Sequence, residues 1–221
     1  MYIMRNNEFS SGPAEVLFYA EKIPYFEVEN LKILNLKAYH LRIILSNLDK
    51  KGKIIRLKKG FYTSRRFLEK TKKEGTFSSF LEFLATKIYS PSYLSLDYVL
   101  YQNNILTEIP GSFTLVTKNK TYNTSNGLGT FIYHKIKDSL FYGYDIDRKD
   151  DFPVCRARKA KALFDFLYLR KNVISNREMA AELRLNLDVF NRKERRELIR
   201  YIESEGSKKM KDIYSFVFEH A

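Results

Sequence analysis

Cysteine is almost absent from this chain of 221 residues, which contains only Cys155. One cysteine cannot form a disulfide within the chain, and it cannot supply the several thiolates of a structural zinc site. Tryptophan is missing altogether, although there are 16 tyrosines and 17 phenylalanines, and that bias points to no function. We therefore expect neither a disulfide framework nor a thiolate metal centre, as is usual in a reducing cytoplasm.

Long apolar runs are also missing. No stretch reaches the roughly 20 apolar residues that a membrane-spanning helix needs. Residues 1–10 lack the apolar core of a signal peptide. The sequence therefore predicts a soluble, cytoplasmic protein that has no membrane partner.

Histidine is scarce, with only His40, His134 and His220. Their positions do not have the spacing of metal ligands, and no cysteine accompanies them. The segment Gly127-Leu128-Gly129 predicts a hairpin turn, because it lacks the following helix and later acid of a dinucleotide-binding fingerprint. We predict no cofactor, no metal and no catalytic residue.

One pair of acids leaves an enzymatic alternative open. Asp145 and Asp147 are two residues apart and could share a strand face, as the carboxylates of a metal-dependent nuclease do. They precede the loop-like run Arg148-Lys149-Asp150-Asp151, so we interpret them as solvated loop acids.

Positive charge is what the chain has in excess, and residues 32–73 contain nearly all of it. This stretch holds fourteen Lys/Arg and two acids within a chain of net charge +13, and the remaining residues hold 25 bases and 24 acids. Clustered positive charge is typical of nucleic-acid-binding surfaces. We predict two domains, a basic one of residues 1–73 and a balanced one of residues 74–221.

The basic stretch has the pattern of a helix followed by a hairpin. Residues 37–51 predict an amphipathic helix that ends at Gly52, with one apolar face formed by Leu41, Ile44, Leu45 and Leu48. Residues 53–57 and 61–63 predict two strands joined by a turn at Lys58-Lys59-Gly60. Together with helices predicted at residues 14–22 and 26–34, this order is typical of a winged helix-turn-helix domain spanning residues 10–64.

The predicted contacts to double-stranded DNA form four groups. The helix would present Lys37, Tyr39, His40, Ile43 and Asn47 to the major groove. Phosphate contacts are predicted for Arg42, Lys50 and Lys51 beside that face, for Arg56, Lys58 and Lys59 on the wing, and for Arg65 and Arg66 in a basic linker at residues 65–75. The alternative is a solvated basic helix and hairpin that bind nothing.

Residues 74–221 predict a mixed α/β domain, which makes the fold class α+β. Helices are predicted at residues 76–89 and 95–101, and Ser95 is the expected N-cap of the second. A small antiparallel sheet is predicted from strands at residues 112–117, 120–124, 129–136 and 139–144. Further helices are predicted at residues 160–169, 192–203 and 207–218. A capping box of Ser175 and Glu178 predicts another short helix, which runs to Leu183.

Several short segments resemble the AbiEi-type antitoxins of type IV toxin–antitoxin systems. They are Pro91-Ser92-Tyr93-Leu94-Ser95-Leu96, Asn104-Ile105-Leu106, Thr117, Gly129-Thr130-Phe131-Ile132-Tyr133, Phe141-Tyr142-Gly143-Tyr144 and Lys161-Ala162-Leu163-Phe164-Asp165-Phe166-Leu167-Tyr168-Leu169-Arg170, with Gly60-Phe61-Tyr62 in the basic domain. The order and spacing of these segments carry the resemblance. It implies a transcriptional repressor that binds inverted repeats in its own promoter and neutralises a cognate nucleotidyltransferase-type toxin, with the antitoxin activity in the C-terminal domain.

The chain departs from that family at one point. Where the family often has Ala-x-Pro-Glu-Lys-Ala, this chain has Ala157-Arg158-Lys159-Ala160-Lys161-Ala162. The change adds positive charge and predicts a second basic surface formed by Arg156, Arg158, Lys159 and Lys161. That surface could bind the toxin, extend the DNA contact or simply be solvated, and a basic module that binds an acidic protein remains a further alternative. The oligomeric state cannot be predicted.

Overall fold

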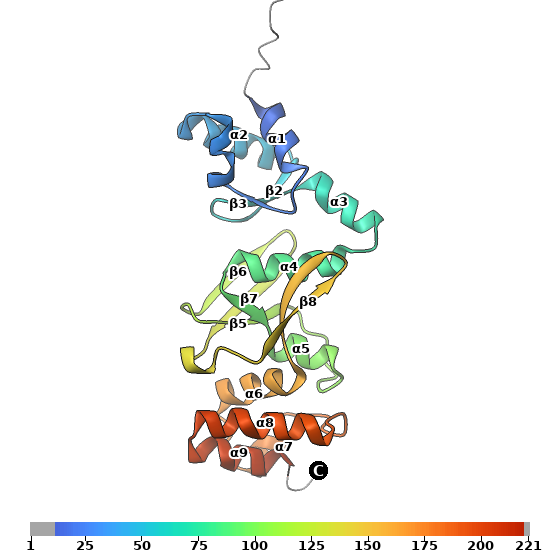
Figure 1. The fold of residues 1–221 in the computed structure, drawn as a ribbon, viewed down its shortest axis with the longest axis vertical. Helices are drawn as coiled ribbons and strands as arrows, with labels where there is room; N and C mark the ends of the chain where they lie inside the picture. The colour runs from blue at the N-terminus through green and yellow to red at the C-terminus, as the bar shows by residue number, and fades with distance from the viewer. Residues whose placement is uncertain (1–11, 219–221) are drawn as a thin grey trace, which may run out of the picture. The chain divides into compact units, whose positions relative to one another are not determined.

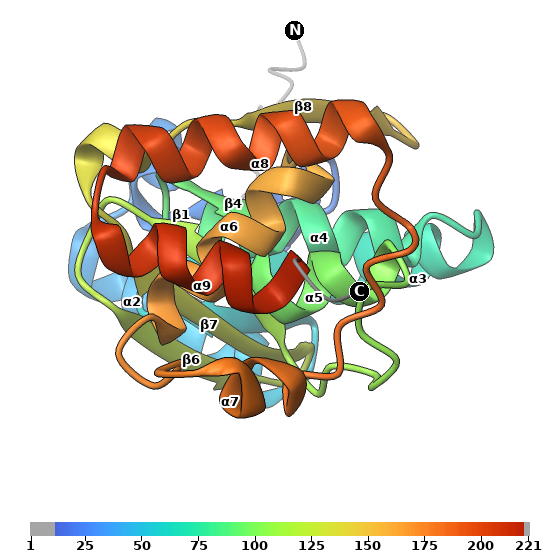
Figure 2. The same cartoon turned by 90° about the horizontal axis from the view of Figure 1, so that it is seen from below.

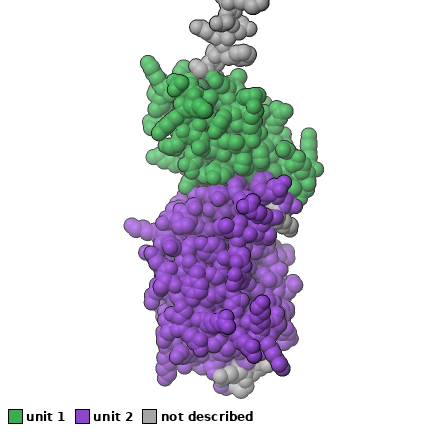
Figure 3. Space-filling view, viewed as in Figure 1, with its two compact units in different colours: residues 1–80 green, residues 81–221 purple. Residues whose placement is uncertain are grey.

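A computed structural model describes residues 12–218, which have a mixed α and β fold with two sheets (Figure 1). The chain divides into two compact units, residues 1–80 and residues 81–221, coloured green and purple in Figure 3. The division falls within helix α4 (Phe77–Ile88), seven residues after the predicted domain boundary. No helix in the described part of the chain is long and apolar enough to cross a membrane.

Unit 1 combines short helices with a three-stranded antiparallel sheet. Its elements are α1 (Pro13–Ala20), β1 (Phe26–Glu27), the 3-10 helix η1 (Val28–Leu34), α2 (Ala38–Lys50), β2 (Ile54–Lys58), β3 (Phe61–Ser64) and α3 (Arg65–Lys73). The strand order is β1-β3-β2. The sequence patterns correctly located α1, α2 and both hairpin strands, but residues 26–34 form a short strand and a 3-10 helix in place of the predicted α-helix. Residues 10 and 11 of the predicted winged helix-turn-helix domain lie outside the described residues.

An apolar cluster packs the helices of unit 1 together. It includes Val16 and Ala20 of α1, Phe26 of β1 and Leu31 of η1, all with no exposed surface. The apolar face of α2 packs into the same cluster, as its 3.6-residue period predicts. This packing fixes which face of α2 remains in solvent.

The predicted linker is wrong, because residues 65–73 form helix α3. Ser64 caps this helix, and its hydroxyl accepts a hydrogen bond from the amide of Phe67 at 3.0 Å. Leu68 and Thr71 are buried, so the segment contributes to the packing of unit 1. The sequence showed no apolar helical periodicity here, because most residues of the segment are charged and only two of them are buried.

Unit 2 is built on a six-stranded mixed sheet, and the prediction of a small antiparallel sheet is wrong. The strands are β4 (Ser92–Leu94), β5 (Phe113–Thr117), β6 (Tyr122–Asn126), β7 (Gly129–Lys135), β8 (Tyr144–Lys149) and β9 (Phe152–Ala157). Their order is β6-β7-β5-β4-β9-β8, with β5 parallel to β7 and β4 parallel to β9. The predicted turn at residues 127–129 joins β6 to β7. The predicted strand at 139–144 is largely absent, since η2 (Asp138–Leu140) and Gly143 at φ 81° interrupt it.

Helices cover this sheet. They are α4, α5 (Leu96–Gln102), α6 (Lys159–Arg170), α7 (Arg177–Ala181), α8 (Arg192–Glu205) and α9 (Lys208–Phe218). Helix α6 is buried along most of its length and lies on the sheet side of α8 and α9 (Figures 1 and 2). The predicted capping box of Ser175 and Glu178 is wrong, because α7 is capped by Asn176 alone, whose side chain accepts a hydrogen bond from the amide of Met179.

A buried polar cluster joins α6 to the sheet. Lys161 and Asp165 have no exposed surface, and the Lys161 Nζ lies 2.6 Å from the Asp165 Oδ1. The hydroxyls of Ser95 and Tyr93 donate to Asp165 Oδ2 at 2.8 and 3.0 Å. Ser95 occupies the N-cap position of α5, as predicted, but its hydroxyl donates to Asp165 and makes no capping bond to the helix. Burial raises the pKa of the Asp165 carboxyl, while the Lys161 ammonium acts in the opposite direction.

Candidate nucleic-acid interface

Helix α2 has two chemically different faces. Leu41, Ile44, Leu45 and Leu48 are buried, which orients the helix within unit 1. At its C-terminal end Gly52 adopts φ 64°, and its amide donates to the carbonyl of Asp49 at 2.9 Å. A glycine accepts this left-handed conformation without strain, so the chain can leave α2 and turn into β2.

The other face of α2 carries the residues that the sequence assigned to DNA. All are exposed: Lys37, Tyr39, His40, Arg42, Ile43, Asn47, Lys50 and Lys51. Two are apolar and still in solvent, with Tyr39 74% exposed and Ile43 39% exposed. The structure therefore brings these predicted residues together on one helix, with Lys37 immediately before it and Lys51 immediately after it.

The β2–β3 hairpin carries the next group. Its turn is formed by Lys59 and Gly60, with Gly60 at φ 78°, and the register shifts between Arg56 and Lys58. Such a bulge increases the local twist of a hairpin. Arg56 and Lys59 are exposed, whereas Lys58 is half-buried with its Nζ 5.5 Å from the centre of the Phe61 ring.

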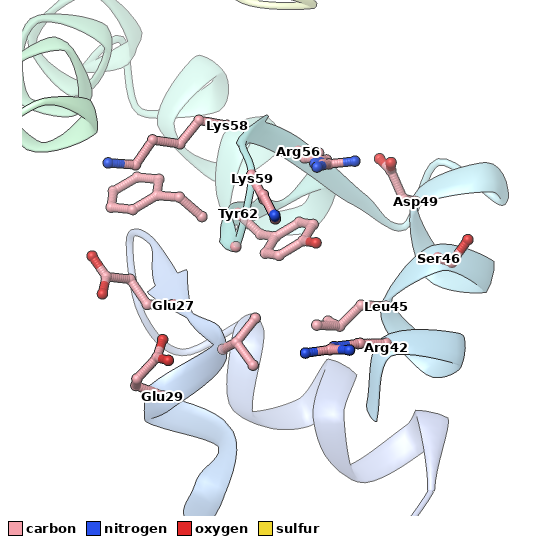
Figure 4. A pocket seen from close by; sticks show the side chains of 13 residues that line it. Glu27, Glu29, Arg42, Leu45, Ser46, Asp49, Arg56, Lys58, Lys59 and Tyr62 are labelled. Atoms are coloured by element: carbon pink, nitrogen blue, oxygen red, sulfur yellow. The ribbon is translucent and has the colours of Figure 1, made fainter. Parts of the chain in front are cut away.

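A hollow separates α2 from the hairpin (Figure 4). Arg42, Ser46 and Asp49 line it from α2, and β1 and η1 contribute Glu27 and Glu29. The hairpin lines the opposite side with Arg56, Lys58, Lys59, Gly60, Phe61 and Tyr62. Cations thus stand on two sides of a concave surface that also contains carboxylates.

Tyr62 contributes a hydroxyl to this hollow. Burial raises the pKa of Tyr62, the nearby Arg56 lowers it, and Asp49 raises it. A raised pKa keeps the phenol protonated at neutral pH. The hollow therefore offers a hydrogen-bond donor as well as cations.

Most of the basic residues of this region have no acidic partner. Two of the fourteen between residues 32 and 73 form ion pairs, Arg66 with Glu21 at 2.9 Å and Lys70 with Glu74 at 3.8 Å. The other twelve form no ion pair with any residue between 12 and 218. Like charges held together without counter-charges create a positive potential that attracts anions.

The two arginines assigned to the linker lie at the start of α3. Arg65 is exposed, and its Nε donates to the carbonyl of Gly52 at 3.3 Å. Arg66 is also exposed and pairs with Glu21. Because of these contacts, α3 begins beside the end of α2.

Each of the four residues of the predicted second basic surface has an acidic partner. Besides the buried Lys161, Arg156 pairs with Glu82 at 2.6 Å and Lys159 with Glu194 at 2.8 Å. Arg158 pairs with Asp145 at 2.8 Å and with Glu197 at 3.4 Å. The sequence could not show these partners, which lie up to 74 residues away along the chain.

One group of unit 2 cations without acidic partners lies on α8. Arg192, Arg196 and Arg200 recur every four residues, and with Lys193 they are exposed. They line a shallow hollow beside Arg158 and Glu197, and form no ion pair with another described residue. The four-residue spacing was the signal in the sequence that could have located this group.

The acids considered for catalysis are engaged elsewhere. Asp145 and Asp147 lie on strand β8, not in a loop. Hydrogen bonding from Arg158 holds the pKa of Asp145 below its usual value, and Asp147 Oδ2 lies 3.9 Å from the Arg156 Nε. Within residues 12–218, no group of three or more His, Cys, Asp or Glu side chains is placed to hold a metal ion.

The remaining candidates are one cysteine and two histidines. Cys155 is free and half-buried, and burial raises the pKa of its thiol, which disfavours the reactive thiolate. His134 lies on β7, where burial lowers the pKa of its imidazole. His220 lies outside the described residues. In comparisons with known proteins, the chain matches no protein-family model and no curated protein.

Proposed function

We propose that unit 1 is a winged helix-turn-helix domain that binds double-stranded DNA. Helix α2 is its recognition helix and the β2–β3 hairpin is its wing. The observation that carries this proposal is the concentration of twelve unpaired Lys and Arg in one stretch of unit 1. When these cations contact DNA phosphates, they release counterions from the DNA, and this release favours binding. An acidic protein partner rarely offers so extended an array of charge.

The geometry of α2 and the hairpin supports the assignment of roles. An α-helix fits the major groove of B-DNA, and the exposed face of α2 is free to enter it. Arg42 on α2, together with Arg56 and Lys59 on the hairpin, borders the hollow between the two elements (Figure 4). These cations would bind the phosphates on the rim of the groove while the hairpin follows the backbone.

The biological role rests on the resemblance to AbiEi-type antitoxins. We propose a repressor that binds inverted repeats in its own promoter and thereby regulates its operon. In this proposal unit 2 neutralises a cognate nucleotidyltransferase-type toxin. Three of the segments on which the resemblance depends lie on strands β4, β5 and β7 of the mixed sheet of unit 2, and the longest lies on α6.

A gel-shift titration tests the DNA-binding proposal. The full chain is titrated against its own upstream DNA and against a scrambled duplex of equal length, at two salt concentrations. We expect tighter binding to the upstream DNA and weaker binding at higher salt. Equally weak binding to both duplexes would contradict a repressor and favour a basic module that binds a protein.

Growth rescue tests the antitoxin proposal. The chain and the protein encoded next to it are expressed from separate inducible promoters, so that repression of the operon plays no part. We expect the neighbouring protein alone to stop growth and the chain to restore it. Continued arrest in the presence of the folded chain would remove the antitoxin role and leave the DNA-binding proposal intact.

A further inference from the structure

Three side chains form a row along the exposed face of α2: Tyr39, Ile43 and Asn47. They recur every four residues, a spacing that places side chains above one another on one side of a helix. All three are exposed, and they lie opposite the buried Leu41, Leu45 and Leu48. The row therefore follows the outermost line of the helix.

The apolar members of this row stand among basic residues. Tyr39 and Ile43 are followed along the helix by Lys50, and Arg42 and His40 flank them on either side. Single apolar residues on a surface are common and mean little by themselves. Here two apolar side chains occur four residues apart at the centre of the positive face. A surface that bound only phosphates would carry charged side chains at these positions.

We infer that this row reads thymine and adenine in the major groove, an inference that rests on the proposed DNA binding. Of the groups that base pairs expose in the major groove, the 5-methyl group of thymine is apolar, and apolar side chains recognise it by contact. Asn47 supplies the amide that pairs with N6 and N7 of adenine. Tyr39 and Ile43 cover thymine methyl groups, Asn47 binds adenine, and the surrounding cations hold the phosphates.

The preferred ligand is therefore duplex DNA with A·T pairs at the centre of each site. Lysine and arginine contacts to phosphate carry no sequence information, so they set affinity and orientation. Discrimination comes from the three-residue row. A thymine methyl buried against Ile43 or Tyr39 contributes about a fourfold gain in affinity, and two such contacts about tenfold or more.

Replacement of thymine by uracil tests this inference. The full chain first selects its tightest duplexes from a 30-base-pair library with a randomised centre. The selected duplex is then synthesised again with deoxyuridine in place of every thymidine, which removes only the methyl groups. We expect A·T pairs at the centre of the selected duplexes and about tenfold weaker binding to the uracil form.

Matched variants show which side chains are responsible. We expect Tyr39→Ser combined with Ile43→Ser to bind the thymine and uracil duplexes equally. Because both side chains are exposed, this variant keeps the packing of unit 1. The control Phe18→Ser, which removes an apolar side chain 63% exposed on α1, should keep the tenfold difference.

The outcomes separate this inference from the proposed function. The inference that this row recognises thymine and adenine fails if the unchanged chain binds thymine and uracil duplexes equally. It also fails if selection yields G·C pairs at the centre. Either result would still support DNA binding. The inference also fails if the double variant keeps the tenfold difference. If no duplex binds at all, the proposed function and the inference fail together.

Discussion

Asp165 shows how much one buried residue can depend on its neighbours. Its carboxyl group accepts hydrogen bonds from Lys161, Ser95 and Tyr93, and it has no contact with water. The ammonium of Lys161 also donates to the carbonyl of Leu140 at 2.8 Å. A charge in such a site is tolerated because its partners replace the lost hydration.

Removal of Lys161 or Asp165 should therefore lower the free energy of unfolding more than removal of one residue from an exposed ion pair. We expect Lys161→Met to lower the free energy of unfolding by about 3 kcal/mol, because Asp165 must stay buried as an uncompensated charge or take up a proton. Urea denaturation followed by circular dichroism measures the change. In the Lys161→Met background, Asp165→Asn should recover part of the loss, since the amide oxygen still accepts from Ser95 and Tyr93.

The matched control is Lys70→Met, which breaks the exposed pair with Glu74. Exposed pairs contribute little, so this change should cost less than about 1 kcal/mol. Equal losses for the two lysines would mean that burial of the Lys161 pair has no energetic consequence.

The β2–β3 hairpin allows a test at the level of a single element. We expect Lys58→Ala with Lys59→Ala to weaken binding to operator and random DNA by similar factors, because phosphate contacts do not read sequence. The slope of log affinity against log salt should become shallower by about two units if both lysines contact phosphate. Fluorescence anisotropy over a range of salt concentrations measures it.

A second pair of lysines provides the control for this experiment. Lys135 and Lys137 are exposed in unit 2, so their replacement by alanine removes the same charge without touching the hairpin. This variant should keep the original salt slope. An unchanged slope in the hairpin variant would exclude the hairpin as a phosphate-binding wing.

Periodic elements of this chain could be predicted from sequence, and short or polar ones could not. Helix α2 alternates apolar and polar residues with a clear helical period, so its limits and exposed face followed from the sequence alone. Strand β4 has only three residues, all buried, and therefore has no alternation to detect. Strand β8 carries charged residues that resemble a loop.

Contacts between distant segments were the second barrier. The parallel pairs β5–β7 and β4–β9 depend on chain crossings that no local pattern encodes. Lys161 was predicted on a basic surface because its segment adds positive charge, and lysine is rarely buried. The signal that could have corrected this was Asp165, four residues later in an otherwise apolar helix.

At the scale of the whole molecule, charge and packing are distributed unequally. The densest positive charge lies in residues 32–73 of unit 1, and each unit has its own buried residues. In the proposed function these units have different tasks, DNA binding for unit 1 and neutralisation of the toxin for unit 2. The two activities should therefore be separable by substitutions in one unit.

We expect the Lys58→Ala and Lys59→Ala variant to lose repression of its own promoter and still rescue growth when expressed from an unrelated promoter. A promoter–reporter fusion measures repression, and colony counts measure rescue. Loss of both activities in a variant that folds normally would show that the tasks are not divided in this way.

The complete burial of Lys161 also makes it an internal reporter of unfolding. Among the described residues, it is the lysine with no exposed surface, while the lysines of α2, α3 and the hairpin turn are accessible to reagents. An amine-directed acylating reagent should modify those lysines within minutes and reach Lys161 only when α6 separates from the sheet. The rate at which mass spectrometry detects acyl-Lys161 would then give the opening rate of unit 2, without denaturant and without an introduced probe.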